Sequence, residues 1–180
     1  GLMTALARQM GLPEDEVHAA ARGGLLHDMG KAVTPHGVLN KPGSLTEDEY
    51  LTIISNKTAS LMAAACQTGA IMGQAGPAAE QGMKQYGLNL GTAFQMIDDT
   101  LDYVSHNQKF GKTLWKDLQG GKITLPLIHA LEGATGDERR IISDTLSRVE
   151  PDTSDAQRIL QLINKYHGTD YAFARAREYV

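Results

Sequence analysis

The stretch FQMIDDTLD, residues 94–102, places three carboxylates on one otherwise apolar helix, and the rest of the chain is organised around it. Asp98 and Asp102 are four residues apart and share one helical face, with Asp99 about 100° around the axis. Gln95 precedes Asp98 by three residues and joins the same cluster. Carboxylates this close repel one another, and a cation would relieve the repulsion. Oxygen ligands without His or Cys favour Mg²⁺, which shares its shell with waters and phosphates. The alternative is a solvated acidic edge of an amphipathic helix.

Apolar residues recur at helical spacing on both sides of this stretch, which predicts an all-α protein. Pro13 followed by three acidic residues predicts a helix start, and either Ser44 or Thr46 is expected to open the next helix. Two Pro and two Gly predict a loop between them. The expected helices cover residues 14–28, 44–71, 78–104, 139–149, 156–166 and 171–180, with the loop over 34–43.

The composition excludes several classes of protein. The net charge of −4 over 180 residues gives no sign of a nucleic-acid partner or of binding to an anionic membrane surface. A single cysteine, Cys66, cannot form an internal disulfide. The sequence has no apolar run long enough for an integral membrane segment and no signal-peptide pattern, so a cytoplasmic protein is expected.

Lysines cluster just after the acidic residues. Lys112, Lys116 and Lys122 lie within eleven residues on a Gly-rich stretch, and Lys57 interrupts an apolar helix. Carboxylates that bind Mg²⁺, together with lysines that neutralise the remaining oxygens, would suit a diphosphate. The alternatives are a solvated basic turn and a Lys57 that reaches water from a packed stem.

Four motifs carry a resemblance to a known family: Lys57-Thr58-Ala59, FQMIDDTLDY, Phe110-Gly111-Lys112 and KDLQGGKITLPLIHAL. In order and spacing they resemble the C-terminal half of trans-type polyprenyl diphosphate synthases. The resemblance implies a partial isoprenoid-synthase-like helical bundle. It also implies a transferase that condenses an allylic diphosphate head-to-tail with isopentenyl diphosphate, using Mg²⁺.

The resemblance assigns roles to residues that match the family's motifs. Asp98, Asp99 and Asp102 would bind Mg²⁺, and Lys57, Lys112 and Lys122 would contact the diphosphate. Thr58 and Gln95 would steady the allylic cation and, with Lys57, form the catalytic group.

The chain also departs from the family's pattern. Trp115 stands where the family usually has Gly, and Gly120 where an acid commonly precedes Gly-Lys. Residues 1–93 contain no second DDxxD, although the family uses a first Asp-rich motif on an earlier helix. We therefore expect impaired chain elongation by this chain alone.

Residues 1–46 carry a second resemblance. His27-Asp28-Met29-Gly30-Lys31 and Leu39-Asn40-Lys41-Pro42-Gly43-Ser44-Leu45-Thr46 resemble an HD-GYP-type domain of the HD superfamily. This implies a division into an HD-like fragment, 1–46, and a synthase-like region, 47–180. His27 and Asp28 form a weak alternative metal site, or His27 makes an ordinary hydrogen bond at a helix end.

Two other functions stay open from the sequence: an HD-type metal-dependent phosphohydrolase, and a non-catalytic partner subunit of a complete prenyl synthase. A synthase core without several of its helices should leave apolar helical faces uncovered. We therefore expect a homo- or hetero-oligomer.

Overall fold

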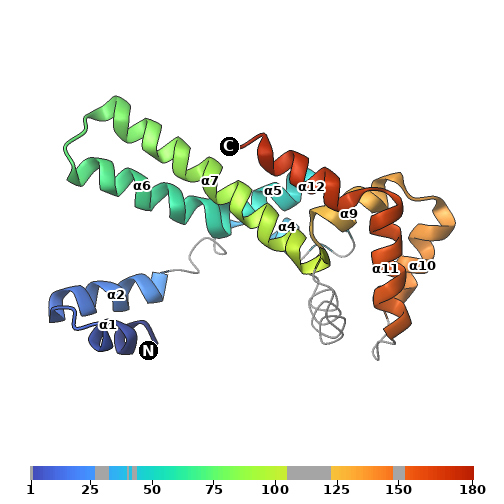
Figure 1. Cartoon of the computed structure of the whole chain (residues 1–180), viewed down its shortest axis with the longest axis horizontal. Coiled ribbons are helices and arrows are strands. Elements are labelled where there is room, and N and C mark those ends of the chain that lie inside the picture. Colours follow the sequence, from blue (N-terminus) through green and yellow to red (C-terminus); the bar gives the residue numbers. More distant parts are fainter. Residues whose placement is uncertain (1, 27–32, 40, 42–43, 105–122, 148–152) are drawn as a thin grey trace.

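The computed structural model describes residues 2–26, 33–39, 41, 44–104, 123–147 and 153–180, which contain helices and no strand (Figure 1). This confirms the expected all-α class. The helices are α1 (Leu2–Gln9), α2 (Glu14–Leu26), α4 (His36–Leu39), α5 (Glu47–Ile54), the π-helix η1 (Ser55–Ala59), α6 (Ser60–Met72), α7 (Pro77–Val104), α9 (Leu125–Gly133), α10 (Gly136–Leu146), α11 (Thr153–Lys165) and α12 (Gly168–Arg177).

Helices α1 and α2 pack on each other and bury Ala7 and Val17 between them. Helix α2 begins at Glu14, after Pro13, as predicted. The expected loop over 34–43 is wrong in part, because α4 forms one helical turn there. Pro35 comes directly before α4, and its fixed φ favours a helix start. The proposed division at residues 46 and 47 stays a prediction.

Thr46 is the residue that opens α5. Its side chain accepts a hydrogen bond from the Glu49 amide, and the Glu49 carboxylate accepts one from the Thr46 amide at 2.8 Å. This reciprocal pair satisfies two amide groups that the first helical turn leaves without a helical partner. Lys41 also donates to Glu49, at 2.6 Å, and this bond is the main reason that the pKa of Glu49 is lowered.

The segment predicted as one helix over 44–71 contains a π-helical turn. Helix α5 continues through η1 into α6 without a break, and the π turn contains Lys57 and Thr58. Such single π turns are rare and occur often at functional sites.

Helices α6 and α7 run side by side (Figure 1). Two glycines of α7 permit the contact: a Cβ on Gly87 would lie 2.6 Å from the carbonyl oxygen of Met62, and one on Gly91 would lie 2.6 Å from the Cα of Ala59. The predicted long helix over 78–104 is confirmed within one residue.

Two buried clusters join the remaining helices. One consists of residues from α5, α7, α9 and α12, with Met96 fully buried at its centre. The other joins the end of α7 to α9, α10 and α11 around Ile159 and Ile163. The predicted helices over 139–149 and 156–166 both begin three residues earlier than expected. For α10 the reason is Thr135, which caps the helix with Glu138 and places Gly136 inside it.

A row of apolar side chains on α7 is exposed. We call it the α7 stripe: Met83, Tyr86, Leu90, Phe94, Ile97, Leu101 and Val104. Its members are three or four residues apart, which puts them on one face of the helix. Among the described residues, no helix is both long and apolar enough to cross a membrane.

Candidate functional site

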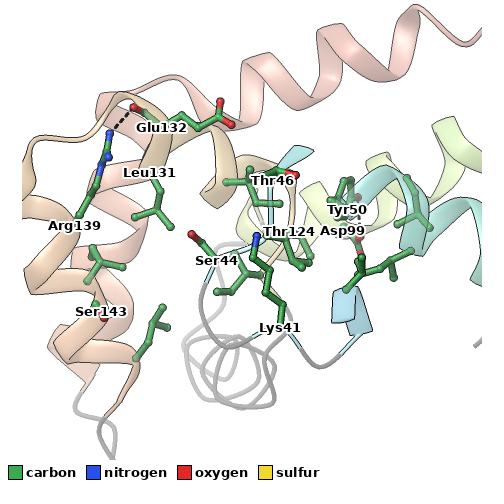
Figure 2. Close-up of a pocket in the computed structure, with 18 of the residues that line it drawn as sticks. Lys41, Ser44, Thr46, Tyr50, Asp99, Thr124, Leu131, Glu132, Arg139 and Ser143 are labelled. Carbon is green, nitrogen blue, oxygen red and sulfur yellow. Dashed lines mark hydrogen bonds between the residues drawn. The ribbon is translucent and has the colours of Figure 1, made fainter. Parts of the chain in front are cut away.

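A cavity of about 1120 Å³ lies between α5, η1, α7, α9 and α10 and the segment that precedes α5. Lys57, Gln95 and Asp99 line it. Figure 2 shows Tyr50 beside Asp99 in one part of the cavity wall and Arg139 and Ser143 in another. Apolar walls come from Ile53, Ile54, Ile128 and Leu131. The cavity therefore combines a charged region with a surface that suits an apolar chain.

The three predicted metal ligands have different environments on α7. Asp98 is exposed, Asp102 is half-buried, and Asp99 is only 3% exposed. The side chain of Asp99 contacts the first helix of the synthase-like region: Tyr50 Oη donates to Asp99 Oδ2 at 2.8 Å. Gln95 Nε2 donates to Asp99 Oδ1 at 3.1 Å. Both oxygens of Asp99 thus already accept hydrogen bonds from protein groups.

Tyr50 remains protonated under this arrangement. Burial is the largest cause that raises the pKa of its hydroxyl, followed by the negative charge of Asp99 and the hydrogen bond to it. A phenol that keeps its proton is a permanent donor to the carboxylate.

The predicted pair Thr58 and Gln95 is in direct contact. Thr58 Oγ1 donates to Gln95 Oε1 at 2.8 Å, across the boundary between η1 and α7. Lys57, the neighbour of Thr58 in the π turn, has an exposed side chain that lines the cavity. The structure therefore brings together the three residues that the resemblance assigned to catalysis.

Several predicted site residues lie outside the described residues. These are Lys112 and Lys122 from the lysine cluster, and His27 and Asp28 from the HD-like segment. Their roles stay predictions. Within the described ranges, no group of three or more His, Cys, Asp or Glu side chains is placed to hold a metal ion.

The donors on α7 nevertheless fit Mg²⁺ in their chemistry. Asp98 and Asp102 are one turn apart, so their carboxylates project from the same face of the helix. Mg²⁺ in proteins is commonly held by one or two carboxylates together with waters and substrate phosphates. This pair suits an ion that arrives with a diphosphate. A third bond from Asp99 stays a prediction.

Tyr50 and Lys41 are among the polar residues of the cavity that the sequence did not reveal. Tyr50 is 49 residues from Asp99 in the chain, so no local motif links them. Lys41 also lines the cavity, where its partner is Glu49. Lys41 belongs to the stretch that resembles an HD-type domain, so the sequence did not connect it with the residues of this cavity.

Known proteins resemble this chain in sequence. The polyprenyl synthetase family model matches residues 12–163. The geranylgeranyl diphosphate synthase of Saccharolobus solfataricus is 36% identical over 135 residues, which are 75% of this chain and 40% of that protein. The octaprenyl diphosphate synthase of Escherichia coli is 36% identical over 146 residues, which are 78% and 43% of the two chains. The chain thus spans about two fifths of the length of these curated relatives.

Solved structures show the same likeness. A decaprenyl diphosphate synthase from Rhodobacter capsulatus superimposes with a TM-score of 0.72 at 27% identity, over 93% of this chain and 51% of that one. A polyprenyl synthase from Caulobacter crescentus, complexed with calcium and isoprenyl diphosphate, gives 0.70 at 31% identity, over 93% and 50%. The family model begins at residue 12, inside the segment with the HD-like pattern, whose origin stays a prediction. With most of its length matched by one family model, the chain belongs to the polyprenyl synthetase family.

Proposed function

We propose that this chain is the diphosphate-binding part of a prenyltransferase that condenses an allylic diphosphate with isopentenyl diphosphate. One observation carries the proposal: Lys57 from one motif and Gln95 and Asp99 from another line one cavity. Membership in the polyprenyl synthetase family supports it. The solved relative with bound calcium and isoprenyl diphosphate supports the ligand class.

The carboxylates would bind the metal ion, and the lysines would bind the diphosphate. Asp98 and Asp102 would hold Mg²⁺, which when bound supplies Lewis-acid stabilisation of a leaving diphosphate. The Lys57 ammonium would neutralise phosphate oxygens at the cavity wall. Lys112 and Lys122 would add to this charge.

The cation that remains after the diphosphate leaves needs electron-rich neighbours that do not react with it. Gln95 Oε1 and Thr58 Oγ1 are such neutral oxygens, and their mutual hydrogen bond holds them together. Ile53, Ile54 and Ile128 form an apolar wall that would accept the isoprenoid chain and exclude water from the cation.

We further propose that this chain alone elongates poorly, since its 180 residues contain a single DDxxD. A carboxylate cluster from another polypeptide segment would be needed to complete the second metal site. Product assays with geranyl diphosphate and isopentenyl diphosphate test this, and elongation by the isolated chain at a normal rate would refute it.

The test of the proposed function is calorimetry with geranyl diphosphate in the presence and absence of Mg²⁺. We expect binding that requires Mg²⁺ and is lost in Asp98→Asn, an exposed position whose change spares the core. Asp170→Asn, an equally exposed acid on α12, serves as the control and should bind like the parent. A folded parent that does not bind with Mg²⁺ present would refute the proposal.

A non-catalytic subunit that associates with a complete synthase is the second candidate. The α7 stripe favours it, because a contiguous exposed apolar row usually marks a protein contact. Co-purification with a complete synthase, unaffected by Asp98→Asn, would support this role over catalysis.

A further inference from the structure

Four side chains form a continuous hydrogen-bonded chain from α5 across α7 to η1. Tyr50 donates to Asp99 at 2.8 Å, Gln95 donates to Asp99 at 3.1 Å, and Thr58 donates to Gln95 at 2.8 Å. We call these residues the Tyr50 relay. Tyr50, Asp99 and Gln95 line the cavity, and Tyr50 also belongs to the buried core.

In the Tyr50 relay, donors and acceptors can be assigned in only one way. An ionised carboxylate only accepts hydrogen bonds, so Gln95 must turn its NH₂ group toward Asp99. Its carbonyl oxygen must then face Thr58, whose hydroxyl donates to it. An amide oxygen has two lone pairs, and one of them is left for a positive charge in the cavity. The orientation of Gln95 therefore depends on Asp99.

The position of Asp99 in turn depends on Tyr50. Both side chains are 3% exposed, so bulk water cannot readily substitute for the phenol as a donor. The ring of Tyr50 belongs to the cluster that includes Ile54, Met96 and Ala172, which holds its hydroxyl in place. A rigidly packed residue that directs a functional side chain through hydrogen bonds is the arrangement that keeps an active site preorganised.

We propose that Tyr50 is a positioning residue: through Asp99 it fixes the amide of Gln95, so that the oxygens of Gln95 and Thr58 face the allylic cation. This inference rests on the proposed function. It gives Asp99 a role in orienting Gln95, distinct from that of Asp98 and Asp102, which would hold the metal ion.

The experiment compares the parent with Tyr50→Phe, which removes one hydroxyl and retains the ring in the core. Three probes are titrated with Mg²⁺ by calorimetry: inorganic diphosphate, geranyl diphosphate, and an ammonium analogue in which a protonated nitrogen replaces the carbon that becomes positive. Tyr166→Phe is the control, since the hydroxyl of Tyr166 also donates to a carboxylate, that of Glu138 at 2.8 Å, and neither residue lines the cavity.

We expect the parent to prefer the ammonium analogue over geranyl diphosphate. Tyr50→Phe should reduce this preference roughly tenfold, the usual scale for one hydrogen bond to a charged group. Its affinity for inorganic diphosphate should not change, and Tyr166→Phe should keep both properties. Equal losses for all three probes, or an unchanged preference, would overturn the positioning role.

If Tyr50→Phe folds poorly, Asp99→Asn alone tests the same path, since it should lose the preference for the ammonium analogue while keeping its affinity for inorganic diphosphate. Where both variants fold, a double-mutant cycle joins the two tests. If Tyr50 acts through Asp99, Asp99→Asn should lower the preference for the ammonium analogue over geranyl diphosphate. Adding Tyr50→Phe to Asp99→Asn should not lower this preference further. Additive losses would overturn the relay. A folded parent that binds none of the probes would refute the proposed function and the relay together. A parent that binds diphosphate, with a Tyr50→Phe variant of unchanged preference, would refute the relay alone.

Discussion

Arg175 in the last helix donates from Nε to Oε1 of Glu47 at 2.7 Å, although 128 positions separate the two residues. Tyr171 donates to the other oxygen of Glu47, and its ring stacks on His129 with a centroid distance of 3.8 Å. Burial and the bond to Glu47 raise the pKa of Tyr171 to about 12. This contact ties α12 to the first turn of α5, and so holds the helix that carries Tyr50.

Replacing Glu47, which accepts hydrogen bonds from both Tyr171 and Arg175, should therefore weaken the packing of α12 on α5. We expect Glu47→Gln to lower the free energy of unfolding by about 1.5–3 kcal/mol, the range for hydrogen bonds to charged groups in a largely buried setting. The midpoint of urea unfolding measures this. Glu178→Gln is the control, because Glu178 also pairs with Arg175 but is exposed, and a change within about 0.5 kcal/mol is expected. Equal effects of the two substitutions would contradict the idea.

Stability should depend on pH through Glu138. The Lys165 ammonium is the largest influence that lowers the pKa of Glu138, from 4.5 to about 2, with help from the Thr135 amide and Tyr166. Because the folded-state pKa is depressed, the stabilisation is complete above about pH 5 and is lost as the pH falls toward about 2. Urea midpoints of the parent and Glu138→Gln should differ above this window and converge at its acidic end. A difference that stays constant with pH would exclude this linkage.

Two glycines on one helix should respond to alanine with opposite signs. In Gly91→Ala the new methyl group would meet the backbone of Ala59, so η1 and α7 must separate, at a cost of roughly 1–3 kcal/mol. In Gly82→Ala nothing lies within 4 Å of the added Cβ. Helix propensity should then stabilise that variant by up to about 1 kcal/mol. Thermal unfolding followed by circular dichroism compares them. Stabilisation by both substitutions would mean that the two helices are not in close contact.

The α7 stripe should make the isolated chain self-associate and bind apolar dyes, as the sequence leads us to expect. Replacing Ile97 and Leu101 together with Gln should reduce both properties without loss of helix content, because both side chains are at least 40% exposed. Light scattering and dye fluorescence measure the outcome. Met72→Gln, at an 80% exposed residue away from the stripe, should change neither. A monomeric parent without dye binding would refute self-association through the stripe.

The helices were predictable where the sequence carries strong local signals. Thr46 and Glu49 specify the start of α5 by a capping pattern, and Gly76-Pro77 before a long periodic segment specifies α7. The short helix α4 was missed, because two Pro and two Gly in ten residues favour a loop over a single turn.

The site was predictable in part, because its motifs are local while its contacts are not. Thr58 and Gln95 were identified from family motifs, and the structure adds that they touch. Tyr50 could not be identified, since its partner Asp99 lies on another helix and only tertiary packing brings them together. The unequal burial of Asp98 and Asp99 also depends on neighbouring helices, which helical spacing alone does not reveal.

The π turn at Ser55–Ala59 accommodates one residue more than an α-helical turn while α5 and α6 stay continuous on either side of it. Deleting one residue there would restore an α-helix and leave the two flanking helices in nearly the same rotational phase. Tyr50, which precedes the turn, would keep its place beside Asp99. Thr58 lies within the turn and would lose the position from which it reaches Gln95, so the length of this segment matters to the site more than to the packing of the helices.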